Sequence, residues 1–120
     1  MSMDERRIVR AIGAALAAEA ERPMAARVLA SIIRVARGYR WVGVYDAAGD
    51  EVVPLGWTGH DAPPAPGASA LLVGVLGAAG EVAGLIQVEG EGSLAEEDRA
   101  FVERCADAAA GLWRGRGERS

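Results

Sequence analysis

The sequence predicts an α+β domain, in which a four-stranded antiparallel sheet carries its helices on one face. Apolar residues recur at helical spacing before residue 40 and again after residue 93. Between these regions, strand-like segments come in two pairs, each joined by a short turn that contains glycine. The 120 residues, of which 51% are hydrophobic, suffice for one domain with one core. We therefore expect helices first, two hairpins next and one helix last.

Two helices are predicted at the N-terminal end. The segment 4–21 has charged residues on one side and apolar residues at four-residue steps on the other: Ile8, Ile12 and Leu16. Pro23 suits the first turn of a second helix, where its missing N–H group costs no hydrogen bond. Gly38 suits the end of that helix, because glycine readily adopts the left-handed conformation of a C-terminal cap.

Two hairpins follow the helices. The segments 41–46 and 51–57 are rich in β-branched and aromatic residues and flank the turn "AAGD". The segments 71–76 and 82–89 form a second such pair around "GAAG". Pro54 cannot donate a hydrogen bond to a neighbouring strand, so its strand is predicted to lie at an edge of the sheet.

Alternation along the last strand assigns its two faces. One set is apolar and is expected to lie under the helices: Val82, Gly84, Ile86 and Val88. The other set ends in an amide and a carboxylate: Ala83, Leu85, Gln87 and Glu89. We expect this second face to be solvated or to line a polar site.

A C-terminal helix is predicted from Ser93 to near Gly115. Ser93 and Glu96 have the spacing of a capping box, in which each side chain accepts the backbone N–H of the other residue. Cys105 falls on the apolar stripe of this helix, where we interpret it as a core residue. The chain is thus divided into an N-terminal amphipathic helix, a minimal domain and a disordered tail: 1–22, 23–115 and 116–120.

Charge and composition exclude several classes of partner. The net charge of −4 and the pI near 5.0 argue against nucleic-acid binding, which requires clustered cations. No apolar run approaches the length of a membrane span, and the N-terminus lacks the apolar segment of a signal peptide. We expect a cytoplasmic protein with no membrane and no nucleic-acid partner. The single cysteine cannot form an internal disulfide.

Four segments, "YRWVGVYD", "PLGWTG", "EVAGLIQVE" and "SLAEED", occur in this order. Their sequences and order resemble the GAF domain family over residues 24–114, and Asp98 matches the common aspartate of that family. The resemblance implies a GAF/profilin-like fold. Within the family, the chain looks most like small stand-alone bacterial GAF proteins, which include the free-methionine sulfoxide reductases.

One segment departs from the family. A full GAF domain has a further strand and helices that wall its ligand pocket, whereas this chain has only "TGHDAPPAPGASA" there. The resemblance places the catalytic cysteines of the reductases in or near that segment, which contains none here. It places the chromophore-binding cysteine there too. The cyclic-nucleotide binders have an Asn-Lys pair, and this chain has no asparagine or lysine. We therefore expect a protein that is not an enzyme and has no cofactor.

The candidate ligand site lies on the sheet face opposite the helices. Trp41 and Tyr45 share a face by alternation, and the resemblance places that face with the polar set of the last strand. Aromatic rings beside a carboxylate can hold a small cationic or amphipathic molecule. His60, with Asp61 beside it, is either an acid-base or metal-binding pair or an ordinary loop residue. The ligand-binding candidates are Trp41, Tyr45, Trp57, His60, Leu85, Gln87 and Glu89; no catalytic or metal-ligating residue is predicted.

Two functions remain open at the level of the sequence. The first is a non-catalytic GAF-like signalling and interaction module, which we expect to be a homodimer. Its predicted dimer surfaces are the stripe Ile8, Ile12 and Leu16 together with the C-terminal helix, or the open sheet face. The second is a small-molecule sensor or relict reductase-like protein with a reduced pocket, covered by the loop 58–70. We favour the first.

Overall fold

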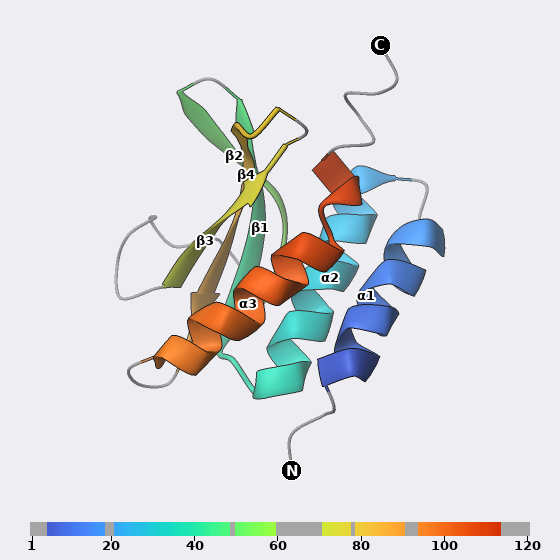
Figure 1. Ribbon diagram of the computed structural model, residues 1–120, viewed down its shortest axis with the longest axis vertical. Coiled ribbons are helices and arrows are strands. Elements are labelled where there is room, and N and C mark those ends of the chain that lie inside the picture. Colours follow the sequence, from blue (N-terminus) through green and yellow to red (C-terminus); the bar gives the residue numbers. More distant parts are fainter. Residues whose placement is uncertain are drawn as a thin grey trace.

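The computed structural model describes residues 5–18, 21–48, 50–59, 71–77, 79–90 and 94–113 (Figure 1). Its elements have the predicted order of two helices, two hairpins and one helix. They are α1 (Glu5–Ala18), α2 (Arg22–Arg37), β1 (Trp41–Ala48), β2 (Glu51–Thr58), β3 (Leu71–Leu76), β4 (Val82–Glu89) and α3 (Glu96–Ala108). The predicted fold class is confirmed. The tail 116–120 lies outside the described residues.

The sheet has the strand order β2-β1-β4-β3, and every neighbouring pair is antiparallel. The two hairpins are joined through β1 and β4, whose register runs from Trp41 opposite Glu89 to Asp46 opposite Gly84. The hairpin β1–β2 places β2 at one edge of the sheet, so the prediction from Pro54 is confirmed. The other edge is β3.

All three helices lie on one side of the sheet (Figure 1). α2 packs on β1 and β2, α3 packs on β3, and α1 packs on α2 and α3. The core between these layers is built from aliphatic residues of the helices and of one sheet face; its fully buried members include Ile8, Ile12, Leu29, Ile33, Val42, Val44, Ile86 and Val88. Among the described helices, none is long and apolar enough to span a membrane.

The helix stripe predicted as a dimer surface is instead part of this core. Ile8 is 1% exposed and Ile12 is not exposed at all, because α2 and α3 cover them. Leu16 is partly buried against the same cluster. The prediction of an intermolecular seam is therefore corrected for Ile8 and Ile12, whose apolar surface is already used within one chain. For Leu16 and the C-terminal helix it stays a prediction.

Val82 is a second correction. It was expected under the helices, but its side chain is 52% exposed. The β3–β4 register shifts between Val75 and Leu76, so that Val82 pairs with Leu76 instead of following the alternation of Ile86 and Val88. One extra residue in a strand moves the side chains beyond it to the opposite face of the sheet. Val82 therefore points, with Leu76, to the face opposite the helices.

The start of α3 differs from the predicted capping box. The helix begins at Glu96 with Ala95 as the N-cap, and Ser93 lies outside the described residues. The Asp98 carboxylate accepts the backbone N–H of Ala95 at 2.9 Å. Its other oxygen accepts the hydroxyl of Tyr39 at 2.6 Å. Asp98 thus caps α3 and ties it to the segment that leads into β1.

Gly56 allows α2 to pack directly on β2. A Cβ atom at this position would lie 2.8 Å from the backbone nitrogen of Arg27 and 3.2 Å from the backbone carbon of Ala26. Side-chain movement cannot relieve a contact with helix backbone. The close approach of helix and strand therefore requires glycine at residue 56.

Arg22, at the start of α2, joins this helix to β1 and to the segment that follows α3. Its guanidinium donates to both oxygens of Asp46, at 2.7 and 3.0 Å, and its Nε donates to the carbonyl of Leu112 at 3.1 Å. The two charged side chains are only 27% and 16% exposed. A bidentate pair in this setting is stronger than an ordinary surface pair.

Substitution Arg22→Gln is expected to lower the free energy of unfolding by about 2 kcal/mol, because it removes the charged donors from a mostly buried carboxylate. Urea denaturation followed by circular dichroism measures the change. The control is Arg104→Gln, since Arg104 pairs with Glu5 at a more exposed position. We expect the control to have little effect. Equal effects of the two substitutions would contradict the special role of Arg22.

Candidate functional site

The candidate site forms a second buried group, on the sheet face opposite the helices. Trp41 and Gln87 are fully buried, and Tyr45 is 4% exposed. The register explains how they meet: Gly43 lies opposite Gln87 in the centre of the sheet, with Trp41 and Tyr45 two residues away on either side. The predicted shared face is thus the one on which the structure places these side chains.

Tyr45 and Gln87 form a polar pair within this group. The Tyr45 hydroxyl donates to Oε1 of Gln87 at 3.3 Å, which is long for such a bond. In the part of the chain that the structure describes, Nε2 of Gln87 is buried and has no hydrogen-bond acceptor. A buried amide nitrogen has two N–H groups to satisfy, and leaving them unsatisfied is costly. The group therefore holds a buried amide whose N–H groups have no acceptor among the described residues.

Trp41 covers the centre of this face. A Cβ atom on Gly43 would lie 2.2 Å from Cη2 of the indole, so the far end of the six-membered ring packs directly against the glycine. The backbone of Gly59, just beyond β2, also lies against Trp41, since a Cβ atom there would be 2.7 Å from Cδ1. The indole is thus held between Gly43 of β1 and the backbone of Gly59, just beyond β2. It forms an aromatic wall next to the Tyr45–Gln87 pair.

The environment of Tyr45 keeps its hydroxyl protonated. Burial raises the pKa of Tyr45 above its usual value, and the charge of Glu89 raises it further. Glu89 is half-buried on the neighbouring strand, and Leu85, opposite Tyr45, is also half-buried. The site thus combines an apolar floor, a neutral phenol donor and a carboxylate at its border.

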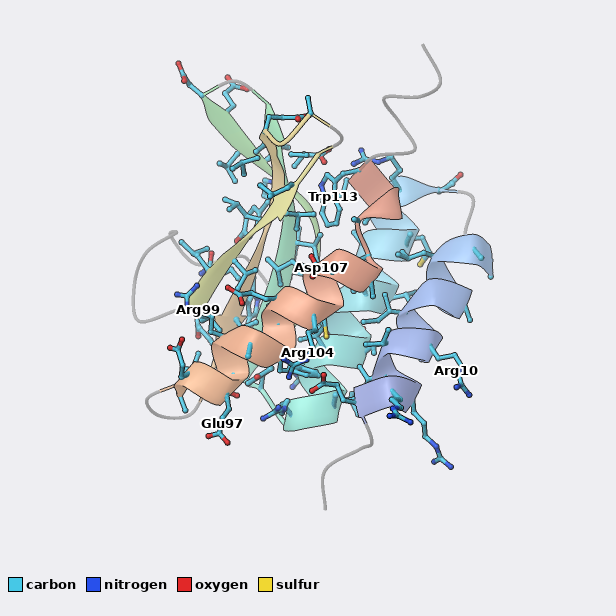
Figure 2. All side chains as sticks on the ribbon, in the orientation of Figure 1. Arg10, Glu97, Arg99, Arg104, Asp107 and Trp113 are labelled. Carbon is cyan, nitrogen blue, oxygen red and sulfur yellow. The ribbon has the colours of Figure 1, made fainter. Side chains whose placement is uncertain are left out.

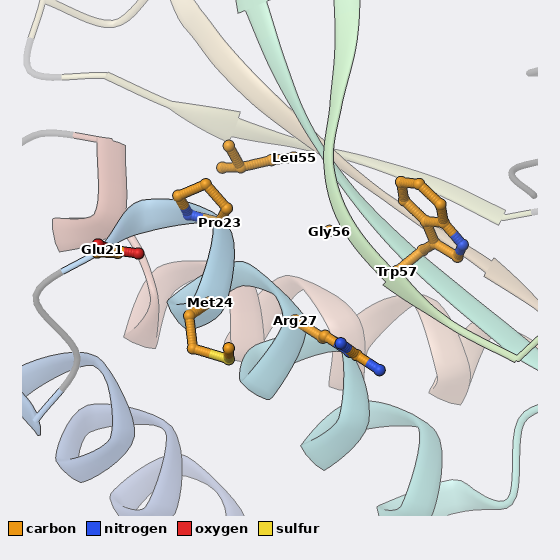
Figure 3. Close-up of a pocket in the computed structure, with 7 residues that line it drawn as sticks. All are labelled: Glu21, Pro23, Met24, Arg27, Leu55, Gly56 and Trp57. Carbon is orange, nitrogen blue, oxygen red and sulfur yellow. The ribbon is translucent and has the colours of Figure 1, made fainter.

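Trp57 lies beside this group, at the edge of the sheet. Its strand position is opposite Gly43, and its half-buried indole also lines a groove of about 440 Å³ between β2 and the start of α2 (Figure 3). Figure 3 shows Trp57 at one end of the groove and Glu21 at the other. The remaining lining residues are Pro23, Met24, Arg27, Leu55 and Gly56. The sequence does not predict this groove, because no local pattern reveals which helix crosses which strand.

His60 and Asp61 lie outside the described residues, so the assignment of His60 to the ligand site stays a prediction. Among the described residues, no three His, Cys, Asp or Glu side chains come together in a way that could hold a metal ion.

Cys105 lies on the opposite side of the sheet from the candidate site. It is fully buried in the helix-side core, as its place on the apolar stripe predicts. Burial, with a smaller contribution from the charge of Glu5, raises the pKa of its thiol to about 12. Since a thiolate is the nucleophilic form, this thiol is unreactive near neutral pH.

Stability is expected to fall as the pH rises above 9. The unfolded thiol loses its proton near pH 9, whereas the folded thiol keeps it to about pH 12. The native state then binds more protons than the unfolded state, so the free energy of unfolding decreases by up to about 1.4 kcal/mol per pH unit. Denaturation of the wild type and of Cys105→Val between pH 8 and 10 measures this slope. The difference between the two proteins isolates the thiol, because Tyr39 and Tyr45, whose pKa values are also raised by burial, contribute to both. The slope should flatten in Cys105→Val; an unchanged slope would contradict the assignment.

The sequence matches no protein-family model and no curated protein. Solved structures do match. The GAF domain of Acinetobacter phosphoenolpyruvate-protein phosphotransferase has a TM-score of 0.79 at 10% identity, over 100% of this chain and 98% of that chain. The chain has the GAF fold.

Two further structures with this GAF fold differ in described role. A free methionine-R-sulfoxide reductase from Neisseria meningitidis, in complex with its substrate, has a TM-score of 0.76 at 16% identity, over 94% of this chain and 92% of that chain. A putative GAF sensor protein from Burkholderia vietnamiensis has a TM-score of 0.75 at 15% identity, over 100% of this chain and 97% of that chain. The shared fold therefore spans an enzyme and a sensor.

Proposed function

We propose that this protein is a non-catalytic signalling module of the GAF fold, active as a homodimer. The observation that carries the non-catalytic part is the position of Cys105. It is the only cysteine of the chain, and it is buried on the helix side of the sheet with a raised pKa. Sulfoxide reduction by a thiol requires a thiolate next to the substrate. The sheet face opposite the helices, where Trp41 and Tyr45 lie, has no cysteine.

The test is an activity assay with free methionine-R-sulfoxide, the compound class that the Neisseria enzyme acts on. The purified protein is incubated with the sulfoxide and dithiothreitol, and methionine is quantified by chromatography. We expect no methionine above the background without protein. Formation of methionine that is lost in Cys105→Ala would overturn the non-catalytic proposal.

A small-molecule sensor is the second candidate. The buried amide of Gln87, beside the phenol of Tyr45, favours it, because polar donors on an apolar floor are typical of ligand sites. The ligand would contribute an acceptor, such as a carboxylate, carbonyl or sulfoxide oxygen, to Nε2 of Gln87. Putative sensors among the structures of similar fold are consistent with this role.

A thermal-shift screen tests the sensor. Small carboxylates, methionine sulfoxide and cyclic nucleotides are tested at millimolar concentration, since a ligand that binds the native state raises the melting temperature. For a hit, Gln87→Leu should abolish the shift, whereas the exposed-site variant Val35→Ala should retain it. A screen without any shift would contradict sensing of these compounds and leave protein interaction as the module's function.

A further inference from the structure

The two edges of the sheet differ in how well they are protected against pairing with another strand. At one edge, β2 carries Pro54, a register shift and the exposed charge of Glu51, all of which discourage strand addition. At the other edge, β3 has the sequence "LLVGVL", without proline or charge. Within the described part of the chain, β3 pairs only with β4. An apolar edge without charge or proline favours pairing with another strand.

The outward-facing backbone groups of β3 can be identified. In an antiparallel pair, successive residues alternate between bonding the neighbouring strand and pointing their N–H and C=O groups away from it. The carbonyl of Leu72 faces away from β4, since Nη1 of Arg99 on α3 donates to it at 3.5 Å. By alternation, Gly74 and Leu76 also point their backbone groups outward. Gly74 is exposed, and the side chain of Leu76 is 52% exposed.

Charges on α3 are distributed along the same edge. Arg99 lies beside the start of β3, as Figure 2 shows, and Asp107 lies further along α3. Asp107 and Glu103 line a groove of about 290 Å³ together with the strand residues 73–76. The edge therefore carries the guanidinium of Arg99 near Leu72, and the carboxylates of Glu103 and Asp107 along the groove beside residues 73–76.

We infer that a second copy of this chain docks on β3, with the two β3 strands antiparallel about a two-fold axis at Gly74. This arrangement places Leu72 opposite Leu76 of the second copy, whose N–H replaces Arg99 at the carbonyl of Leu72. The other outward N–H and C=O groups of the two strands pair with each other, and Arg99 is released for a contact across the axis. The arrangement also brings Arg99 of each copy toward the groove that Asp107 of the other copy lines, so the two-fold axis generates two such contacts. The two sheets become one continuous eight-stranded sheet. The inference rests on the proposed homodimer and names its surface.

Mass measurement by light scattering tests the dimer first. We expect twice the chain mass of 12.4 kDa at micromolar concentration. Gly74→Pro removes an outward N–H group and should raise the dimer dissociation constant at least tenfold. Gly74→Ala keeps that N–H group and is the matched control; its Cβ would meet only Val82, at 3.8 Å. Circular dichroism verifies that both variants are folded. A wild-type monomer, or a Gly74→Pro dimer as tight as that of Gly74→Ala, would overturn the inference.

A charge exchange tests the geometry. Arg99→Asp alone and Asp107→Arg alone should each be monomeric, because each places like charges across the axis. Mixing the two variants should restore a dimer, since the mixed pair has opposite charges at both contacts. A mixture that stays monomeric overturns the antiparallel arrangement.

These results are separable from those on function. If methionine-R-sulfoxide is reduced, the non-catalytic proposal fails while the dimer through β3 can still be measured. If a dimer forms but neither Gly74→Pro nor the charge variants weaken it, the homodimer stands and the β3 surface is wrong.

Discussion

Replacing Gly56 with valine is expected to lower the free energy of unfolding by about 3 kcal/mol. A Cβ atom at residue 56 would lie 2.8 Å from the backbone nitrogen of Arg27, and a valine adds two methyl groups beyond it. The strand and α2 would have to separate, which would disturb the packing of Ala26 and Leu29 in the core. Few small domains have enough stability to absorb such a loss without a large shift in melting temperature.

Urea denaturation of Gly56→Val measures this change. The control is Gly74→Val in β3, at an exposed strand glycine whose Cβ would meet only the side chain of Val82, at an ordinary contact distance of 3.8 Å. Valine has the higher strand propensity, so the control is expected to keep or raise stability. A Gly56→Val protein as stable as the control would show that α2 does not lie as close to β2 as the structure has it.

Replacing Ile12 with alanine is expected to cost about 3 kcal/mol of the free energy of unfolding. Ile12 is fully buried between α1 and its neighbouring helices, so the deleted atoms leave a cavity. The control is Val35→Ala, which removes methyl groups from a side chain that is 69% exposed on α2 and should change stability little.

The Ile12 result also tests where the folded unit begins. A large loss, in one cooperative transition, would place α1 in the same unit as the sheet. A loss no greater than that of Val35→Ala would instead favour an independent N-terminal helix at 1–22, as the sequence division has it.

The elements of this fold could be predicted because each has a local cause. Pro23 and Gly38 mark the ends of α2, and alternating apolar residues mark the strands; the predicted bounds of β3 and β4 agree with the structure. Whether the apolar stripe of α1 packs within this chain or against another chain could not be predicted. An amphipathic pattern shows that Ile8 and Ile12 need a cover, but the same pattern fits a cover from this chain or from another.

The candidate site was predicted in part for similar reasons. Strand period placed Trp41 and Tyr45 on one face, and the family resemblance placed Gln87 on the same face. The register confirms both placements. The orientation of Val82 depended on a register shift, and a shift results from pairing between strands, not from the sequence of one. The groove beside Trp57 depended on how α2 crosses β2, which is also a property of the tertiary structure.

The strand order also has a consequence for how the chain folds. Each hairpin joins neighbours in sequence, but only the contact of β1 with β4 unites them, and its partners, such as Val44 and Ile86, are far apart in the chain. Local contacts form quickly and distant ones slowly, so we expect both hairpins to precede the rate-limiting closure of this central seam. Stopped-flow refolding should then show that Ile86→Val slows folding more than Val53→Ala in the outer hairpin.

The length of the connection between the two hairpins matters little for the stability of this sheet, since doubling it costs only about 0.6 kcal/mol. A sheet of this order can therefore keep its fold while the segment between its hairpins changes in length.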